Sequence, residues 1–72
     1  MIVSDKHGDR FSVFRSMDQQ KRTVLVMGKL SPVGPVVRLA IASGSNPDLW
    51  HIIDSAAITQ DEVLKYYELT KV

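Results

Sequence analysis

The sequence predicts a small α+β domain: an antiparallel sheet of three to four strands in a meander, with one C-terminal helix packed on one face. Short apolar runs rich in β-branched residues alternate with turn residues, and a capping box precedes a helical pattern near the C-terminus. A chain of 72 residues holds one domain. We therefore divide a single domain, 1–72, into an irregular start (1–9), a β-meander (10–58) and a capped C-terminal helix (59–70).

Three strands account for most of the meander. Residues 10–17 place aromatic and β-branched side chains near every second position, and residues 22–30 form the most apolar run of the chain. Between them, 18–21 is a polar segment of hairpin-turn length. Segment 31–35 holds two prolines and a glycine, which favour a turn, and residues 36–42 return as the third strand.

Residues 49–58 allow two interpretations. They follow a loop at 43–48, in which Asn46 and Pro47 could begin a helix, and apolar residues then recur at helical spacing. The run Leu-Trp-His-Ile-Ile at 49–53 is instead rich in strand-forming residues. We favour a fourth strand and keep the helix as the alternative.

A capping box marks the start of the C-terminal helix. The hydroxyl of Thr59 can accept from the backbone amide of Glu62, whose carboxylate can reach back to the amide of Thr59. Asp61 lies one turn before Lys65, where the two can pair. The pattern predicts a helix across 60–69.

One helix covers one face of a sheet, and successive side chains of a strand point to opposite faces. Every second residue, which we call residues of one parity, therefore lies beneath the helix. The residues of one parity form the predicted core: Phe11, Val13, Val24, Val26, Leu30, Val37, Leu39 and Ile41.

The opposite parity has an apolar centre and a basic rim. Phe14, Leu25 and Met27 supply the apolar part, and Lys29 and Arg38 supply the rim. Because a solvated sheet face is usually polar, this pattern predicts a partner-binding surface made of these residues.

A second arrangement of the same strands stays open. The sheet could curl into a small barrel, with bulges at Gly28 or Ser16 that fold both faces around one core. Leu25 and Met27 would then be buried, and the predicted binding surface would be lost.

The composition narrows the class of protein. Hydrophobic residues make up 44% and charged residues 24%, which is typical of a folded chain. Cysteine is absent, which excludes disulfides and thiolate zinc sites, so a core this small is expected to gain stability from a protein partner or a homo-oligomer. No run approaches the ~20 apolar residues of a membrane span, and the start does not resemble a signal peptide. We expect a cytoplasmic protein without a membrane partner.

Catalytic signatures are not found in the sequence. It holds no nucleophile elbow, phosphate-binding glycine loop, dinucleotide fingerprint or metal-ligand spacing, so we expect no enzyme activity, cofactor or metal. His7 and His51 could serve acid–base chemistry, but His51 stands between Trp50 and Ile52, where a structural role is the more common one.

The sequence therefore predicts a small non-enzymatic binding protein that acts by protein–protein interaction. It would modulate or inhibit a larger partner, with a homodimer as one form. Residues 1–38 carry seven Lys and Arg against three Asp, whereas 39–72 carry two Lys against five Asp and Glu. This basic N-terminal half supports an alternative function as a nucleic-acid-binding module, with contacts from Arg10, Phe14, Lys29 and Arg38.

Overall fold

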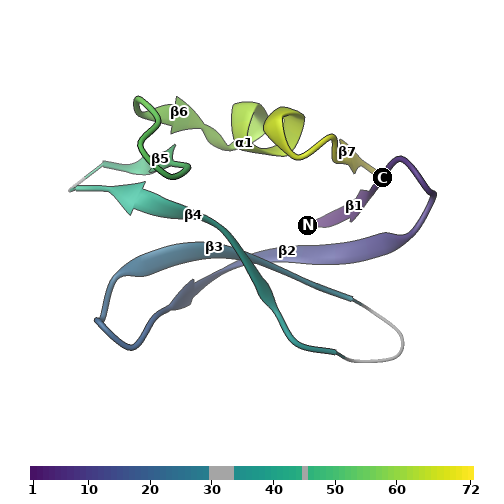
Figure 1. Ribbon diagram of the computed structural model, residues 1–72, viewed down its shortest axis with the longest axis horizontal. Helices are drawn as coiled ribbons and strands as arrows, with labels where there is room; N and C mark the ends of the chain where they lie inside the picture. The colour runs from purple at the N-terminus through teal and green to yellow at the C-terminus, as the bar shows by residue number, and fades with distance from the viewer. Residues whose placement is uncertain (30–33, 45) are drawn as a thin grey trace.

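Antiparallel strands dominate the architecture, and one short helix lies between the last two of them (Figure 1). The computed structural model describes residues 1–29, 34–44 and 46–72. In these ranges the elements follow in the order β1 (Ile2–Ser4), β2 (Arg10–Met17), β3 (Thr23–Lys29), β4 (Val37–Ser43), β5 (Asn46–His51), β6 (Ile58–Thr59), α1 (Gln60–Tyr66) and β7 (Thr70–Lys71). They form one sheet in the order β6-β5-β4-β3-β2-β1-β7.

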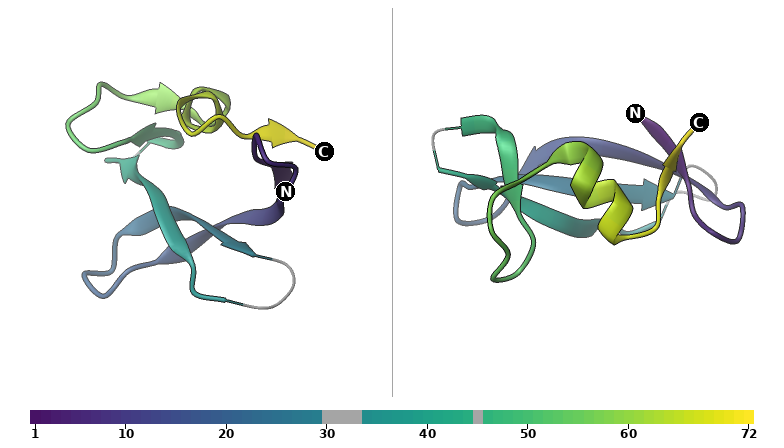
Figure 2. Two further views of the ribbon diagram at one scale, coloured as in Figure 1. Left: turned by 45° about the vertical axis from the view of Figure 1, so that its right-hand side comes forward. Right: turned by 90° about the horizontal axis from the view of Figure 1, so that it is seen from above.

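The sheet is a curled half-barrel, and α1 lies at its open side. The long strands β2, β3 and β4 cross below the helix, while β6 and β7, the two edges of the sheet, are the segments that flank α1 in the chain (Figure 2). The predicted sheet of three to four strands with a helix packed on one face is therefore wrong. Strands of two or three residues are too short to show a sequence period, so β1, β6 and β7 were not expected.

The predicted capping box is confirmed. The Thr59 hydroxyl accepts from the amide of Glu62 at 3.2 Å, and the Glu62 carboxylate accepts from the amide of Thr59 at 3.1 Å. The helix ends at Tyr66, earlier than predicted, because Glu68 adopts a left-handed backbone conformation with φ of 57°. Asp61 pairs with Lys71 of β7 at 2.8 Å instead of Lys65, so this carboxylate ties the helix to an edge strand.

The three long strands match the predicted segments closely, and the preferred strand within 49–58 is found in part. β5 spans Asn46–His51, so it begins inside the expected loop and ends well before residue 58. The rest of that segment is irregular up to β6. Leu30, the start of the 31–35 turn and Ser45 lie outside the described residues.

The register between β2 and β3 corrects the assignment of faces. Val13 lies opposite Met27 and Arg15 opposite Leu25, whereas Phe14 lies opposite Val26. Directly paired residues share a face, so Leu25 and Met27 belong with the core residue Val13 and not with Phe14. Strand pattern alone does not fix how two strands slide past each other, and a shift of one residue exchanges the faces.

One cluster fills the inside of the half-barrel. Leu25 is 1% exposed, and Trp50 and Val63 are fully buried. A bulge in β4 opposite Leu25 and Val26 turns the two consecutive residues Leu39 and Ala40 inward, which alternation would not allow. The buried cluster consists of Val3, Val13, Leu25, Leu39, Ala40, Trp50, Ile52, Val63, Leu64 and Leu69.

The outer face of the sheet carries a smaller apolar group. Val24 and Val26 are buried there, at 3% and 5% exposure, but they do not belong to the main cluster. Phe14 and Val36 converge over Gly28, where a Cβ atom would stand 3.2 Å from a Val36 methyl carbon. The missing side chain of Gly28 is what lets these two residues cover the outer surface of β3.

Candidate functional site

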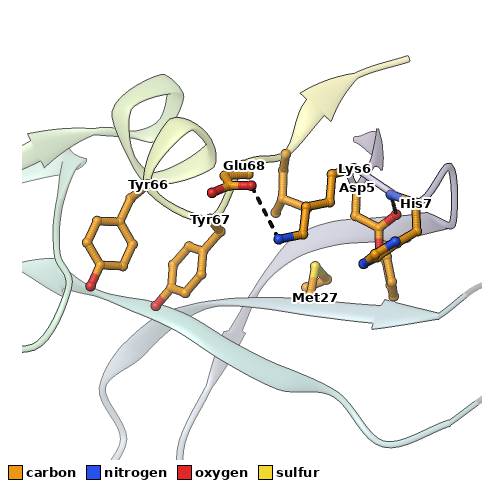
Figure 3. Close-up of a pocket in the computed structure, with 9 residues that line it drawn as sticks. Asp5, Lys6, His7, Met27, Tyr66, Tyr67 and Glu68 are labelled. Carbon is orange, nitrogen blue, oxygen red and sulfur yellow. Dashed lines mark hydrogen bonds and ion pairs between the residues drawn. The ribbon is translucent and has the colours of Figure 1, made fainter.

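Two adjoining cavities lie along the open side of the half-barrel and share Tyr67. We call them together the Tyr67 groove. The first cavity measures about 350 Å³ and is lined by Asp5, Lys6, His7, Phe11, Met27, Tyr66, Tyr67, Glu68 and Leu69 (Figure 3). The second measures about 330 Å³ and is lined by Arg38, Leu39, Ala40, Ile41, His51, Ile53, Asp54 and Tyr67.

The first cavity has an apolar floor and an aromatic wall. Phe11 and Met27 come from the inner face of β2 and β3, and both pack against the main core. Tyr66 and Tyr67 follow each other at the end of α1, with their ring centroids 5.0 Å apart in an edge-to-face arrangement. Tyr66 is 66% exposed, so its ring is a large apolar surface that the monomer leaves in water.

Tyr67 holds the groove in shape. Its hydroxyl donates to the backbone carbonyl of Leu39 at 2.6 Å, which connects the end of the helix to the bulge in β4. Burial, followed by the neighbouring Tyr66, raises the pKa of the Tyr67 phenol above its usual value of 10, and Arg38 opposes this in part. The phenol therefore stays protonated at neutral pH and keeps its donor.

Charged residues form the rim of the first cavity. The Asp5 carboxylate accepts from the amides of His7 and Asp9, both at 2.9 Å, and so fixes the turn between β1 and β2. From this turn Lys6 reaches across to Glu68, with 3.8 Å between the ammonium nitrogen and the carboxylate oxygen (Figure 3). Both side chains are about two-thirds exposed, at 66% and 68%. Such an ion pair contributes roughly 0–1 kcal/mol, so a ligand can displace Lys6 at little cost.

The second cavity is lined by His51, whose two ring nitrogens both have partners within the fold. Nε2 of His51 lies 2.8 Å from the Ser43 hydroxyl, and Nδ1 lies 2.9 Å from the carbonyl oxygen of Ser55. A carbonyl can only accept, so Nδ1 carries a proton, and in the neutral ring Nε2 accepts from Ser43. The Ser55 hydroxyl in turn accepts from the amide of Ile52 at 2.8 Å. These bonds fix the turn after β5 to the end of β4.

Metal ligands do not gather at the groove. Across the described ranges, no group of three or more His, Cys, Asp or Glu side chains is placed to hold a metal ion. The helix that the structure shows is likewise not long and apolar enough to cross a bilayer.

The predicted partner-binding residues do not form one patch. Leu25 is buried in the core, while Phe14 lies on the outer face at 42% exposure. Met27 is half-buried in the floor of the first cavity, and Arg38 lines the second. Lys29 is exposed at the end of β3, opposite Phe11 and therefore on the opposite side from Phe14.

The residues predicted for nucleic acid are partly brought together. By strand register Arg10 and Phe14 lie on the outer side of β2. Arg38 lies opposite Val26 and is therefore on the same side, whereas Lys29 lies on the inner side. The sequence did not indicate that Tyr66 and Tyr67 line one cavity together with the turn between β1 and β2. The adjacent tyrosines were the available signal, but nothing in the pattern indicated that residues 5–7 lie beside them.

Comparisons with protein-family models, with curated proteins and with solved structures find no match to this chain.

Proposed function

We propose that this chain is a small cytoplasmic, non-enzymatic binding protein, and that it modulates a larger protein by docking it in the Tyr67 groove. The observation that supports this proposal is the groove itself: an apolar floor, an exposed aromatic wall and a displaceable charged rim within one small domain. Cavities of ~300–1,000 Å³ with apolar walls and a few polar groups are the usual shape of binding sites.

Binding would place an apolar side chain of the partner in the first cavity, against Met27 and the aromatic wall of Tyr66 and Tyr67. The exposed Tyr66 ring offers contact area with few rotatable bonds, and tyrosine is enriched at positions that dominate interface energies. Lys6 would leave Glu68 as the partner enters, so both charged groups become free to pair with the partner. Such rim charges contribute more to orientation than to affinity.

The polar groups of the groove favour binding over catalysis. The Asp5 carboxylate, the Tyr67 hydroxyl and both ring nitrogens of His51 already have partners within the fold. A catalytic acid or base would have to be within reach of a substrate. These groups are instead used to position turns and strand ends.

A matched pair of variants tests the groove. The immobilised chain would first be used to capture its partner from the cell that makes it, and the dissociation constant would then be measured with the purified partner. Tyr66→Ala removes an exposed ring in the groove, and Phe14→Ala removes an exposed ring on the outer face. We expect the first to weaken binding about tenfold or more and the second to change it little. Equal losses, or a loss with Phe14→Ala alone, would reject the groove.

A specific observation supports nucleic acid as the second candidate. By strand register Arg10 and Arg38 lie on the outer face, and β2, β3 and β4 carry no carboxylate, so this face attracts anions. Phe14 is the exposed aromatic ring among these strands, on which one base could stack. Single-stranded oligonucleotides at low salt test it: we expect binding that weakens steeply with salt and drops with Arg38→Ala. An absence of binding at low salt excludes this candidate.

A further inference from the structure

β1 covers only the first part of β2. Its residues pair with Arg10 to Ser12, and Met1 adds a reciprocal pair of backbone hydrogen bonds with Val13, at 2.8 and 3.2 Å. β2 continues to Met17, as the ribbon shows where it runs on beyond the N-terminus toward the turn into β3 (Figure 1). In the described part of the chain no strand pairs with residues 14–17 on that side.

The direction of the backbone groups follows from Val13. Both its N–H and its C=O point toward β1, and these groups alternate in direction along an antiparallel strand. The N–H and C=O of Arg15 and Met17 therefore point to the same open side. Those of Phe14 and Ser16 point to β3, with which they are in register.

This edge has only one of the usual protections against strand pairing. Native edges are commonly blunted by proline, by charged side chains or by a bulge, and of these the segment Phe-Arg-Ser-Met contains only the charge of Arg15. All four residues are exposed, with Phe14 at 42% and Met17 at 66%. The guanidinium of Arg15 lies over the Trp50 ring, 5.3 Å from its centroid, which holds this side chain against the inner face and away from the edge.

We propose that this edge of β2 pairs with the same edge of a second copy, so that two half-barrels share one continuous antiparallel sheet. A strand edge related by a two-fold axis is complementary to itself, because each copy offers the donors and acceptors that the other needs. The two-fold axis passes through Ser16. Arg15 then lies opposite Met17 of the second copy, and the reverse pair forms on the other side of the axis.

The directions of the backbone N–H and C=O groups and the charge of Arg15 determine the register of the two strands. With the axis at Ser16, the groups paired are those of Arg15 and Met17, which are the open ones. An axis at Arg15 would place two guanidinium side chains directly opposite each other, which is destabilising. The contact is short, so it forms a weak dimer that appears with rising protein concentration.

Two variants that introduce opposite charges at Ser16 test both the dimer and its register. Ser16→Glu and Ser16→Lys each place like charges across the axis, on an exposed outer position where neither change disturbs the core. Sedimentation equilibrium should show the natural chain moving toward twice its 8.1 kDa mass as concentration rises. Each variant alone should dimerise on the order of tenfold more weakly, and an equimolar mixture of the two should recover association. Unchanged far-ultraviolet circular dichroism is the control for folding.

Amide hydrogen exchange provides an independent measurement. The amides of Arg15 and Met17 should exchange quickly in the monomer and become protected at high concentration, while those of Phe14 and Ser16 stay protected throughout. A constant monomer mass up to millimolar protein overturns the proposal, as does a dimer that both variants leave intact. Because Ser16 is outside the Tyr67 groove, partner binding should be unaffected by these variants, so this dimer and the proposed function can fail separately.

Discussion

Shortening Leu25 tests the assignment of the inner face more sharply than any other single substitution. Leu25 is 1% exposed in the centre of the main cluster, whereas Phe14, one register position away on the neighbouring strand, is 42% exposed on the outer face. If the register is right, Leu25→Ala opens a cavity in the core. Phe14→Ala trims a surface that water already reaches.

The size of the effect follows from burial. Leu25→Ala removes the outer carbons of a fully buried side chain, at about 0.8 kcal/mol each, and adds a cavity term, so the expected loss is about 3 kcal/mol. A domain of this size has about 3–5 kcal/mol in total. Phe14→Ala loses only the covered part of the ring over Gly28, roughly 1 kcal/mol.

Urea unfolding followed by Trp50 fluorescence measures both variants. Trp50 is the single tryptophan and is fully buried in the same cluster, so its emission reports the core. A slope near 1 kcal/mol per molar urea converts the expected losses into midpoint decreases of roughly 3 M for Leu25→Ala and 1 M for Phe14→Ala. Equal shifts, or a larger shift for Phe14→Ala, would refute the register and restore Leu25 to the surface.

Three further outcomes follow from single hydrogen-bonded groups. Thr59→Ala removes the cap of α1 and should cost about 1 kcal/mol in urea unfolding, while Thr59→Ser, which keeps the hydroxyl, should cost much less; equal losses would contradict the capping role. Tyr67→Phe leaves the carbonyl of the buried Leu39 without its 2.6 Å donor and should cost about 1–3 kcal/mol, and a variant as stable as the natural chain would show that this bond is unimportant. Hydrogen bonds from the Arg22 amide and guanidinium, together with one from the Gln20 amide, lower the pKa of Asp18. The ionised carboxylate therefore stabilises the fold at pH values above the pKa that Asp18 has in the unfolded chain, and this stabilisation is lost as the pH falls through the lower pKa of the folded state. An NMR titration should show Asp18 ionising below its usual value of 3.8, and Asp18→Asn should flatten the acid end of the stability profile; a normal titration midpoint would contradict this assignment.

The long strands and the helix cap could be predicted because their signals are local. The alternation in residues 10–17 and the apolar run before Lys29 depend only on neighbouring residues, and so does the capping box at Thr59. The short strands β6 and β7 depend instead on distant partners: Thr70 and Lys71 pair with β1 at the other end of the chain. No period is visible in two residues.

The faces of the sheet could not be read from parity alone. Parity orders side chains within one strand, but the relation between β2 and β3 depends on the hairpin, where Asp18 accepts from the Arg22 amide at 2.8 Å and Lys21 has φ of 62°. The bulge in β4 then turns Leu39 and Ala40 inward together. The curled arrangement left open from the sequence did bury Leu25, although the bulge lies in β4 and not at Gly28 or Ser16.

The candidate site was predictable only in part. Met27 and Arg38 were singled out, and both line the Tyr67 groove, but they do so from two separate cavities. The rim formed by Lys6 and Glu68 joins residues from the two ends of the chain. Curling of the sheet creates that proximity, and a flat sheet would not.

The most direct test of the groove as the docking site is NMR chemical-shift mapping on the natural chain, titrated with its purified partner. We expect the largest changes at Lys6, Met27, Tyr66 and Glu68, with little change at Phe14 and Val36 on the outer face. Changes confined to the outer face, with the groove signals unmoved, would contradict it.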